Sequence, residues 1–258
     1  ALDVVDNEAV DNQFEGYRVI VGNGGAVSAL FQSDLASNNT LSGSGHGFNV
    51  QLQNNAASIL QVLDCVSVDN PNGSGFNLAN NGGSVVTIID PTIASGNGGH
   101  GIYLASTAGA SGVSAVLSLD DVIADGNGRD GLHLSVYAPS GGVAAVSCSD
   151  IQANGNASNG LYGEFIGEVS ALGRFDDVDA IGNGDTGFYV TLGSSTSDIT
   201  GVFTDIRANG NSNGIIAQLV GAGWGDITGW FEDIEANGNG SAGFIGVLAG
   251  CGWGNMNG

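Results

Sequence analysis

The chain has 258 residues, with 26 acidic side chains against 4 arginines and no lysine, so its formal net charge is −22. A nucleic-acid-binding surface needs clustered positive charge, and a membrane-spanning helix needs about 18 or more consecutive apolar residues. The chain has neither feature, and its 46 glycines with only 3 prolines do not follow the collagen pattern either.

An internal repeat begins near the N-terminus and runs to the C-terminus. An aspartate recurs every 26 to 31 residues, at Asp3, Asp34, Asp64, Asp90, Asp121, Asp150, Asp177, Asp205 and Asp233. A glycine followed by an apolar residue recurs in parallel, with the apolar residue at Tyr17, Phe48, Phe76, Ile102, Leu132, Leu161, Phe188, Ile215 and Phe244. Because these repeats fill the chain, we predict a single repeat domain over residues 1–258.

Each repeat is expected to contain two strands and a turn. The first strand follows the marker glycine, as in residues 187–192, where side chains alternate with the period of two that is typical of a strand. The second leads into the aspartate, with Phe175, Phe203 or Phe231 two residues before it. Asn-Gly-Asn sequences then predict turns, since both residue types tolerate positive φ. Cys65 and Cys148 fall at core positions, which predicts buried thiols.

Short strands at this spacing bury their apolar faces only by stacking coil on coil. The sequence therefore predicts an all-β, single-domain, right-handed parallel β-helix (β-solenoid) of about nine coils with uncapped ends. In coil length, inward aliphatic stacks and asparagine-bearing turns it resembles the right-handed parallel β-helix repeat family, the pectate-lyase-like superfamily. The turn asparagines are Asn127, Asn156, Asn183, Asn211 and Asn239. The resemblance implies a fold and says little about function.

The asparagine and aspartate columns have different consequences. Stacked asparagines can form a ladder of amide hydrogen bonds, whereas carboxylates about 4.8 Å apart repel one another. Backbone N–H donors, solvation or shared cations such as Ca²⁺ would each relieve that repulsion. Asp177, Asp205 and Asp233 are the candidate cation ligands, and no other cofactor is required. Arg207 stands one coil after Asp179 and one before Glu235, so a local salt bridge is the simpler alternative.

A polysaccharide-acting enzyme is the second alternative interpretation. Two kinds of segment are similar to motifs of polygalacturonases, enzymes whose β-helix resembles the one expected here. They are the Gly-His-Gly segments at His46 and His100 and the aspartate pairs at residues 120–121 and 176–177. The third motif of those enzymes contains lysine, which this chain lacks. His46 and His100 also occupy a repeat position that holds unrelated residues in other coils. We therefore expect no catalytic residues, with a polysaccharide-acting β-helix enzyme kept as an alternative.

The functional hypothesis is based on the two ends of the chain. Neither end has a helix or polar cap, so each exposes core and strand edges. A second copy placed after Gly258 would put its Asp3 28 residues after Asp233, within the spacing of the array. We therefore expect copies to associate head-to-tail into an acidic filament. The expected interface consists of Ala1, Leu2, Asp3, Val4, Val5, Trp253, Asn255, Met256, Asn257 and Gly258.

A piece of a longer secreted adhesin or surface-layer stalk is the alternative to a filament subunit. Such a piece would also keep the repeat in phase at both ends. The start at Ala1 is expected for a chain whose signal peptide has been removed, and strong acidity fits a secreted, extracellular setting. The expected partners are copies of the chain itself, with polysaccharide or cell-surface contact as a further option.

Overall fold

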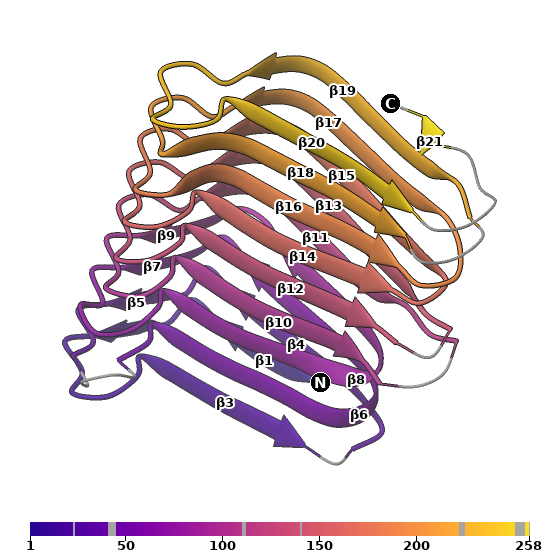
Figure 1. The fold of residues 1–258 in the computed structure, drawn as a ribbon. Helices are drawn as coiled ribbons and strands as arrows, with labels where there is room; N and C mark the ends of the chain where they lie inside the picture. Colours follow the sequence, from indigo (N-terminus) through magenta and orange to yellow (C-terminus); the bar gives the residue numbers. More distant parts are fainter. Residues whose placement is uncertain are drawn as a thin grey trace.

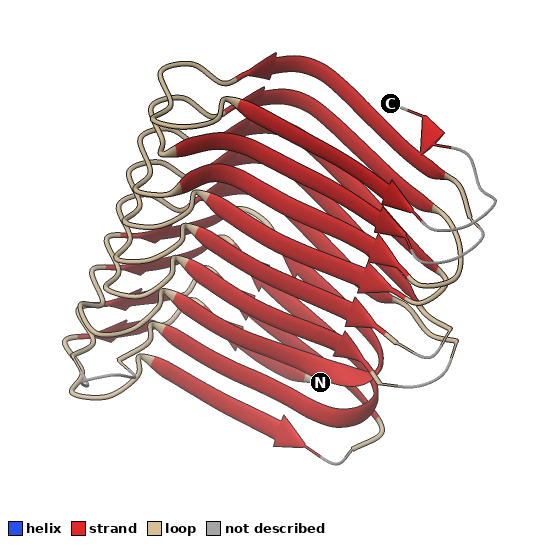
Figure 2. Ribbon diagram, viewed as in Figure 1, coloured by secondary structure: helices blue, strands red, loops and turns tan. Residues whose placement is uncertain are grey.

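A computed structural model describes residues 1–22, 24–40, 45–109, 112–139, 141–221, 225–250 and 256–257. These residues form an all-β, parallel, right-handed solenoid of about eight turns, which confirms the predicted fold, for which about nine coils were expected (Figure 1). Figure 2 shows strands joined by turns and no helix in the described parts of the chain. The nine apolar markers of the sequence lie on nine stacked strands, and nine strands enclose eight turns.

Each coil has three faces, and each interior strand pairs in parallel with the equivalent strands of the coils before and after it. Face 1 consists of β3 (Tyr17–Gly22), the first parts of β6 (Phe48–Leu63) and β8 (Phe76–Ile89), β10 (Ile102–Ala108), β12 (Leu132–Ala138), β14 (Leu161–Gly167), β16 (Thr186–Ser194), β18 (Asn213–Gly221) and β20 (Phe244–Gly250). Face 2 consists of β1 (Leu2–Val5), β4 (Ala26–Gln32), the second parts of β6 and β8, β11 (Ala115–Ile123), β13 (Val143–Gln152), β15 (Ser170–Asp179), β17 (Ile199–Arg207), β19 (Ile227–Glu235) and β21 (Met256–Asn257). Face 3 consists of β2 (Glu8–Val10), β5 (Leu35–Ser37), β7 (Cys65–Val68), β9 (Thr92–Ser95) and the last residues of β11, β13, β15, β17 and β19.

The core lies between the faces and is built from columns of equivalent side chains. Along β10 buried and partly exposed residues alternate without interruption, the pattern that one buried face requires. The rings of Tyr17, Phe48 and Phe76 stack with centroids 4.6 Å apart, about one coil rise. Cys65 and Cys148 are buried free thiols, as predicted, while Cys251 lies outside the described residues.

The asparagine ladder is confirmed and is longer than the sequence indicated, since Asn12, Asn39, Asn70 and Asn97 extend it towards the N-terminus. From Asn12 to Asn156 each side-chain amide donates to Oδ1 of the next asparagine, and the same Oδ1 accepts the backbone N–H of that earlier residue. Asn127, for example, donates from Nδ2 to Asn156 Oδ1 at 3.0 Å and from its backbone N at 2.9 Å. The ladder therefore has one direction: donors belong to the earlier coil and the acceptor to the later coil.

The aspartate column marks the bend between faces 2 and 3, and the structure corrects three of its members. Asp121, Asp150, Asp177, Asp205 and Asp233 adopt positive φ there, a conformation that aspartate tolerates better than most residues. In the first four coils the register gives this position to Asp6, Ser33, Asp64 and Pro91.

Asp3, Asp34 and Asp90 were therefore assigned to the wrong position, because residue type alone does not locate the bend when coil length varies. Asp34 is buried in the core, only 1% exposed, and Asp3 pairs with Leu30 within face 2. The interval from Asp233 to the equivalent residue of a second copy, Asp6, becomes 31 residues rather than 28. Ser33 and Asp64 are also 31 residues apart, so the corrected interval still lies within the range of the array.

Substituting Asn156 with alanine tests the ladder. The change removes the acceptor of the Asn127 backbone N–H and of one side-chain N–H of Asn127, while the other side-chain N–H still donates to Ala94 O. At ~1–3 kcal/mol for each buried group left unsatisfied, we expect a loss of about 2–4 kcal/mol in the free energy of unfolding. The matched control is Asn72→Ala, since Asn72 is exposed and makes one exposed bond to Thr40 O. Urea unfolding followed by circular dichroism measures both, and equal midpoint shifts would contradict the structural role of the ladder.

Candidate functional site

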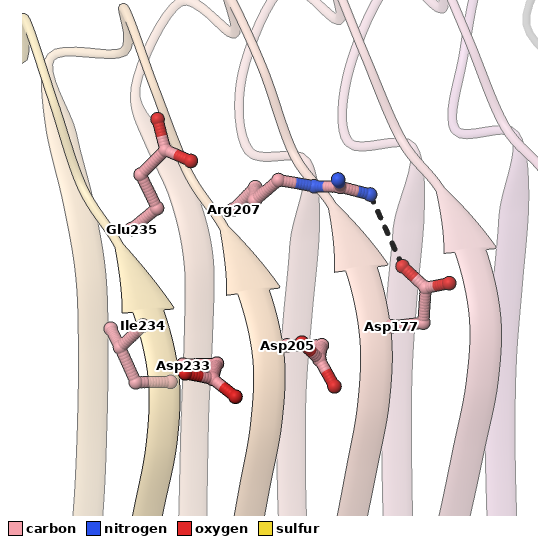
Figure 3. A pocket seen from close by; sticks show the side chains of 6 residues that line it. All are labelled: Asp177, Asp205, Arg207, Asp233, Ile234 and Glu235. Atoms are coloured by element: carbon pink, nitrogen blue, oxygen red, sulfur yellow. Dashed lines mark hydrogen bonds and ion pairs between the residues drawn. The ribbon is translucent and has the colours of Figure 1, made fainter.

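Three of the predicted site residues line a groove along the bend between faces 2 and 3. Asp177, Asp205 and Asp233 lie at the same position of three successive coils, and all three are exposed (Figure 3). Arg207, Ile234 and Glu235 complete the lining. The sequence therefore placed these carboxylates correctly in one column, and solvent reaches each of them.

Arg207 provides the positive charge of this groove. Its guanidinium forms ion pairs with Asp179 and with Asp177, the second at 3.2 Å. It also stands in register between Asp179 and Glu235, as the sequence predicted. The hydrogen bond with Asp179, and then its charge, raise the pKa of Arg207. The predicted salt bridge is thus confirmed for Asp179, whereas no ion pair joins Arg207 to Glu235 among the described residues and Asp177 is a partner that was not predicted. The cation site at Asp177, Asp205 and Asp233 remains a prediction.

Carboxylates without an arginine repel one another across coils. Partial desolvation, and then the charges of Asp120 and Asp177, raise the pKa of Asp150. Desolvation followed by the charges of Asp120 and Asp121 does the same for Asp90. Stacking the coils thus brings negative charges together along the bend between faces 2 and 3 (the acidic bend), as the column of aspartates in the sequence indicated.

The first coil presents open strand edges and an incompletely covered core. Within the described chain, strands β1, β2 and β3 each pair with one strand, that of the following coil. Leu2, Val4 and Tyr17 continue core columns but are only partly buried. In the described residues, Oδ1 of Asn12 accepts no hydrogen bond, although every later asparagine of the ladder accepts through this atom.

The last described coil presents the opposite edges. Phe244 is 46% exposed, whereas Phe188 and Ile215, which precede it in the same column, are 0% and 1% exposed. The Asn239 backbone N–H has no acceptor among the described residues, while its Nδ2 donates to Ala208 O. This coil therefore lacks the acceptor that a following asparagine would supply.

The short strand β21 covers only the start of β19. Met256 and Asn257 pair with Ile227 and Thr228, so Gly229–Glu232 have no partner on that side in the described chain. Of the predicted interface residues, Leu2–Val5 form β1 and Met256–Asn257 form β21, with the exposed Ala1 just before β1. Trp253, Asn255 and Gly258 lie outside the described residues.

The motifs similar to those of polygalacturonases do not meet. His46 and His100 lie in the column directly before face 1, whereas the aspartate pairs lie at the bend after face 2. His100 instead lies against Asp130 and His133, a cluster that the sequence analysis missed. Its signal was present, since Asp130 follows His100 in one column and His133 is three residues further on.

Comparisons with protein-family models, curated proteins and solved structures find no match to this chain. No helix that could span a membrane occurs among the described residues. The assignment of function therefore rests on the geometry of the chain itself.

Replacing Arg207 with glutamine tests the cation interpretation of the groove. The change removes the charge that neutralises Asp177 and Asp179, so we expect Ca²⁺ to bind this groove more tightly than in the original chain. Arg174→Gln removes an equal charge from a different column, where Arg174 pairs with Asp176 at 2.7 Å, and serves as the control. Calorimetric Ca²⁺ titration measures both, and identical affinities in the two variants would contradict a cation site at Asp177, Asp205 and Asp233.

Proposed function

We propose that this chain is a structural, extracellular protein that assembles head-to-tail into an acidic β-helical filament. The observation that carries the proposal is the complementarity of the first and last coils, which offer opposite halves of one hydrogen-bonded ladder. Contact between unlike ends does not close on itself, so it extends into an open filament. The finer resemblance to the pectate-lyase-like superfamily stays a prediction of the sequence.

The asparagine ladder supplies direction to this contact. Among the described residues, the Asn239 backbone N–H at one end meets no acceptor and Asn12 Oδ1 at the other end meets no donor. In a head-to-tail contact the donors of Asn239 meet the acceptor of Asn12 in the next copy, as Asn127 meets Asn156 inside the chain. A contact between two like ends would bring donor to donor or acceptor to acceptor.

The register of face 2 leads to the same contact. Leu2 belongs to the column of Ala29 and, through successive coils, to that of Gly229. Strand β1 of a second copy would therefore pair with Gly229–Glu232, directly after the two residues that β21 covers. The two short strands together complete one full strand on β19, the geometry of strand addition at a sheet edge.

Core columns would continue across the same contact. Tyr17 and Phe244 are the first and last members of one column on face 1, so Phe244 would lie against Tyr17 of the next copy. The aromatic pair would repeat the arrangement of Tyr17 on Phe48 within the chain. Covering Phe244 removes a large apolar surface from water, which favours association.

A longer solenoid would make these contacts covalently, as in an adhesin or surface-layer stalk. In that case coils of the same polypeptide would cover β1 and β20. Mass spectrometry of the native chain separates the two proposals, since a polypeptide much longer than 258 residues would replace the filament subunit with the stalk. The remaining alternative is a polysaccharide-acting enzyme. Depolymerisation of acidic or neutral glycans by the chain would support it.

Blocking one end at a time tests the head-to-tail contact. Phe244→Glu places a charge in the apolar column of the last coil, and Val4→Glu does so in the first coil. We expect each variant alone to remain unassembled in sedimentation velocity experiments. An equimolar mixture should form dimers and stop there, because each variant keeps one working end.

Tyr137→Glu is the control for added charge. Tyr137 is 45% exposed on the outer side of β12, far from either end of the array, and this variant should assemble like the original chain. Dimers of either end variant alone would reveal contact between like ends and overturn the head-to-tail arrangement. A monomeric original chain at high concentration would overturn self-assembly altogether.

Charge makes assembly dependent on salt. With 22 net negative charges over about eight coils of ~4.8 Å, the filament carries roughly one charge per 2 Å, near the density of duplex DNA. At the contact, Glu8 of one copy would face Glu235 of the other, because both belong to one column.

We therefore expect sedimentation to show faster elongation as NaCl rises, and Ca²⁺ to act at far lower concentration and to bundle filaments. Glu8→Gln should lower the salt required, because it removes one of two apposed charges. Assembly and bundling that ignore both Ca²⁺ and a chelator would contradict the role given to cations.

A further inference from the structure

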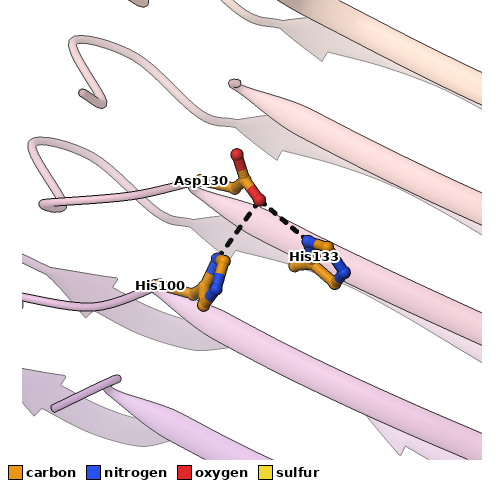
Figure 4. Close-up of side chains that lie close together, drawn as sticks. All are labelled: His100, Asp130 and His133. Atoms are coloured by element: carbon orange, nitrogen blue, oxygen red, sulfur yellow. Dashed lines mark hydrogen bonds and ion pairs between the residues drawn. The ribbon is translucent and has the colours of Figure 1, made fainter. Parts of the chain in front are cut away.

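Two histidines and an aspartate converge on the outer corner of the solenoid, far from the acidic bend. Nδ1 of His133 lies 2.8 Å from Asp130 Oδ2, and Nδ1 of His100 lies 3.2 Å from the same oxygen (Figure 4). All three ligand atoms lie within 4.8 Å of one another, and no other described group of three or more such side chains does so. The cluster spans two coils, since His100 precedes β10 while Asp130 and His133 belong to the next coil.

Neighbouring residues hold each member of the cluster in place. Asp130 uses its second oxygen to accept hydrogen bonds from the backbone N and Nδ2 of Asn159, both at 2.9 Å, which leaves Oδ2 directed at the histidines. The ring of His133 is stacked between Tyr103 and Tyr162, with centroids 5.2 and 4.7 Å away. Such outer partners are what orient the ligands of protein metal sites.

The hydrogen-bonding capacity of the cluster is only partly used. Asp130 is buried, and although burial raises its pKa, the two neighbouring histidines and the hydrogen bonds from Asn159 hold that pKa well below its usual range. It is therefore a carboxylate at neutral pH. Nδ1 of His100 is buried without a hydrogen-bond partner in the described structure, even though it faces this carboxylate.

We propose that His100, Asp130 and His133 form a binding site for a divalent transition-metal ion of the Zn²⁺ type. Imidazole nitrogen with one carboxylate is a donor set that Zn²⁺ binds and that Ca²⁺ and Mg²⁺ do not favour. Bonds of about 2.0–2.2 Å in tetrahedral geometry require ligand atoms ~3.3 Å apart. The distances from Asp130 Oδ2 to the two nitrogens, 3.2 and 2.8 Å, are near this value, and the two histidine nitrogens lie within 4.8 Å of each other, so the rings would turn towards a shared ion.

The ion would join successive coils and keep an outward position open. Three protein ligands leave a fourth place for water or for a donor from another molecule. Because His133 is only partly buried, with 29% of its side chain exposed, such a donor can approach from solvent. The site lies on the lateral surface, so it operates whether or not the ends of the chain associate.

Variants that fit their columns test the site without disturbing the coils. His100→Asn introduces the residue type that this column already holds at Asn159, and His133→Tyr extends the stack of Tyr103 and Tyr162. His46→Asn is the matched control, because His46 shares the column of His100 but its Nδ1 accepts a hydrogen bond from the Ser74 backbone N–H. The full chain is stripped with chelator and titrated with Zn²⁺ by calorimetry, in excess Ca²⁺ to occupy other carboxylates.

We expect one Zn²⁺ per chain, an affinity loss of at least about tenfold in His100→Asn and His133→Tyr, and no change in His46→Asn. The chain has only 3 histidines, so ¹H–¹⁵N spectra of the imidazoles can report each ring separately. Zn²⁺ should shift the ring signals of His100 and His133 and leave those of His46 in place. Binding that is absent in excess Ca²⁺, or unaffected by both cluster variants, would overturn the site.

Discussion

The structure depends on hydrogen bonding between successive coils. No coil contains a complete sheet, so its backbone groups and its apolar side chains are satisfied only by the coil above and the coil below. The buried asparagines make this dependence directional, because each side-chain amide from Asn39 to Asn183 donates to the asparagine Oδ1 of the next coil. The same constraint that holds the interior together leaves the first and last described coils with complementary hydrogen-bonding groups that pair with no described residue.

Charge opposes this stacking. Each added coil brings another set of carboxylates within about 5 Å of the last, and only a few are met by a cation of the chain itself, as Asp179 is by Arg207. The balance favours stacking because apolar columns and amide ladders are buried, whereas the aspartates at the bend are exposed and solvated. Assembly between copies would extend both effects, which is why ionic conditions should control it.

The sequence was informative where a coil position requires one kind of residue. The alternation in residues 187–192 predicted β16, the apolar markers predicted the columns of face 1, and the turn asparagines predicted the ladder. The bend between faces 2 and 3 accepts several residue types, including Ser33 and Pro91, so counting aspartates misplaced Asp3, Asp34 and Asp90. Coil lengths that differ by a few residues hide such shifts until the register of the strands is known.

The histidine cluster was missed for a different reason. His100 and Asp130 share a column, but His133 belongs to the outer column of face 1, and repeat spacing does not reveal contacts between neighbouring columns. Corners of the coil bring such columns together, so chemistry in a solenoid can lie between positions that each look like ordinary repeat variation. Sites of this kind become visible only when the turns that join the faces are placed in space.

Electron cryo-microscopy of the native assembled material tests the central claim most directly. We expect strands at the same ~4.8 Å spacing to continue across the boundary between copies, with Leu2–Val5 of one copy paired to Gly229–Glu232 of the next. A boundary formed by two like ends, or end coils covered by a segment of their own chain, would contradict the account.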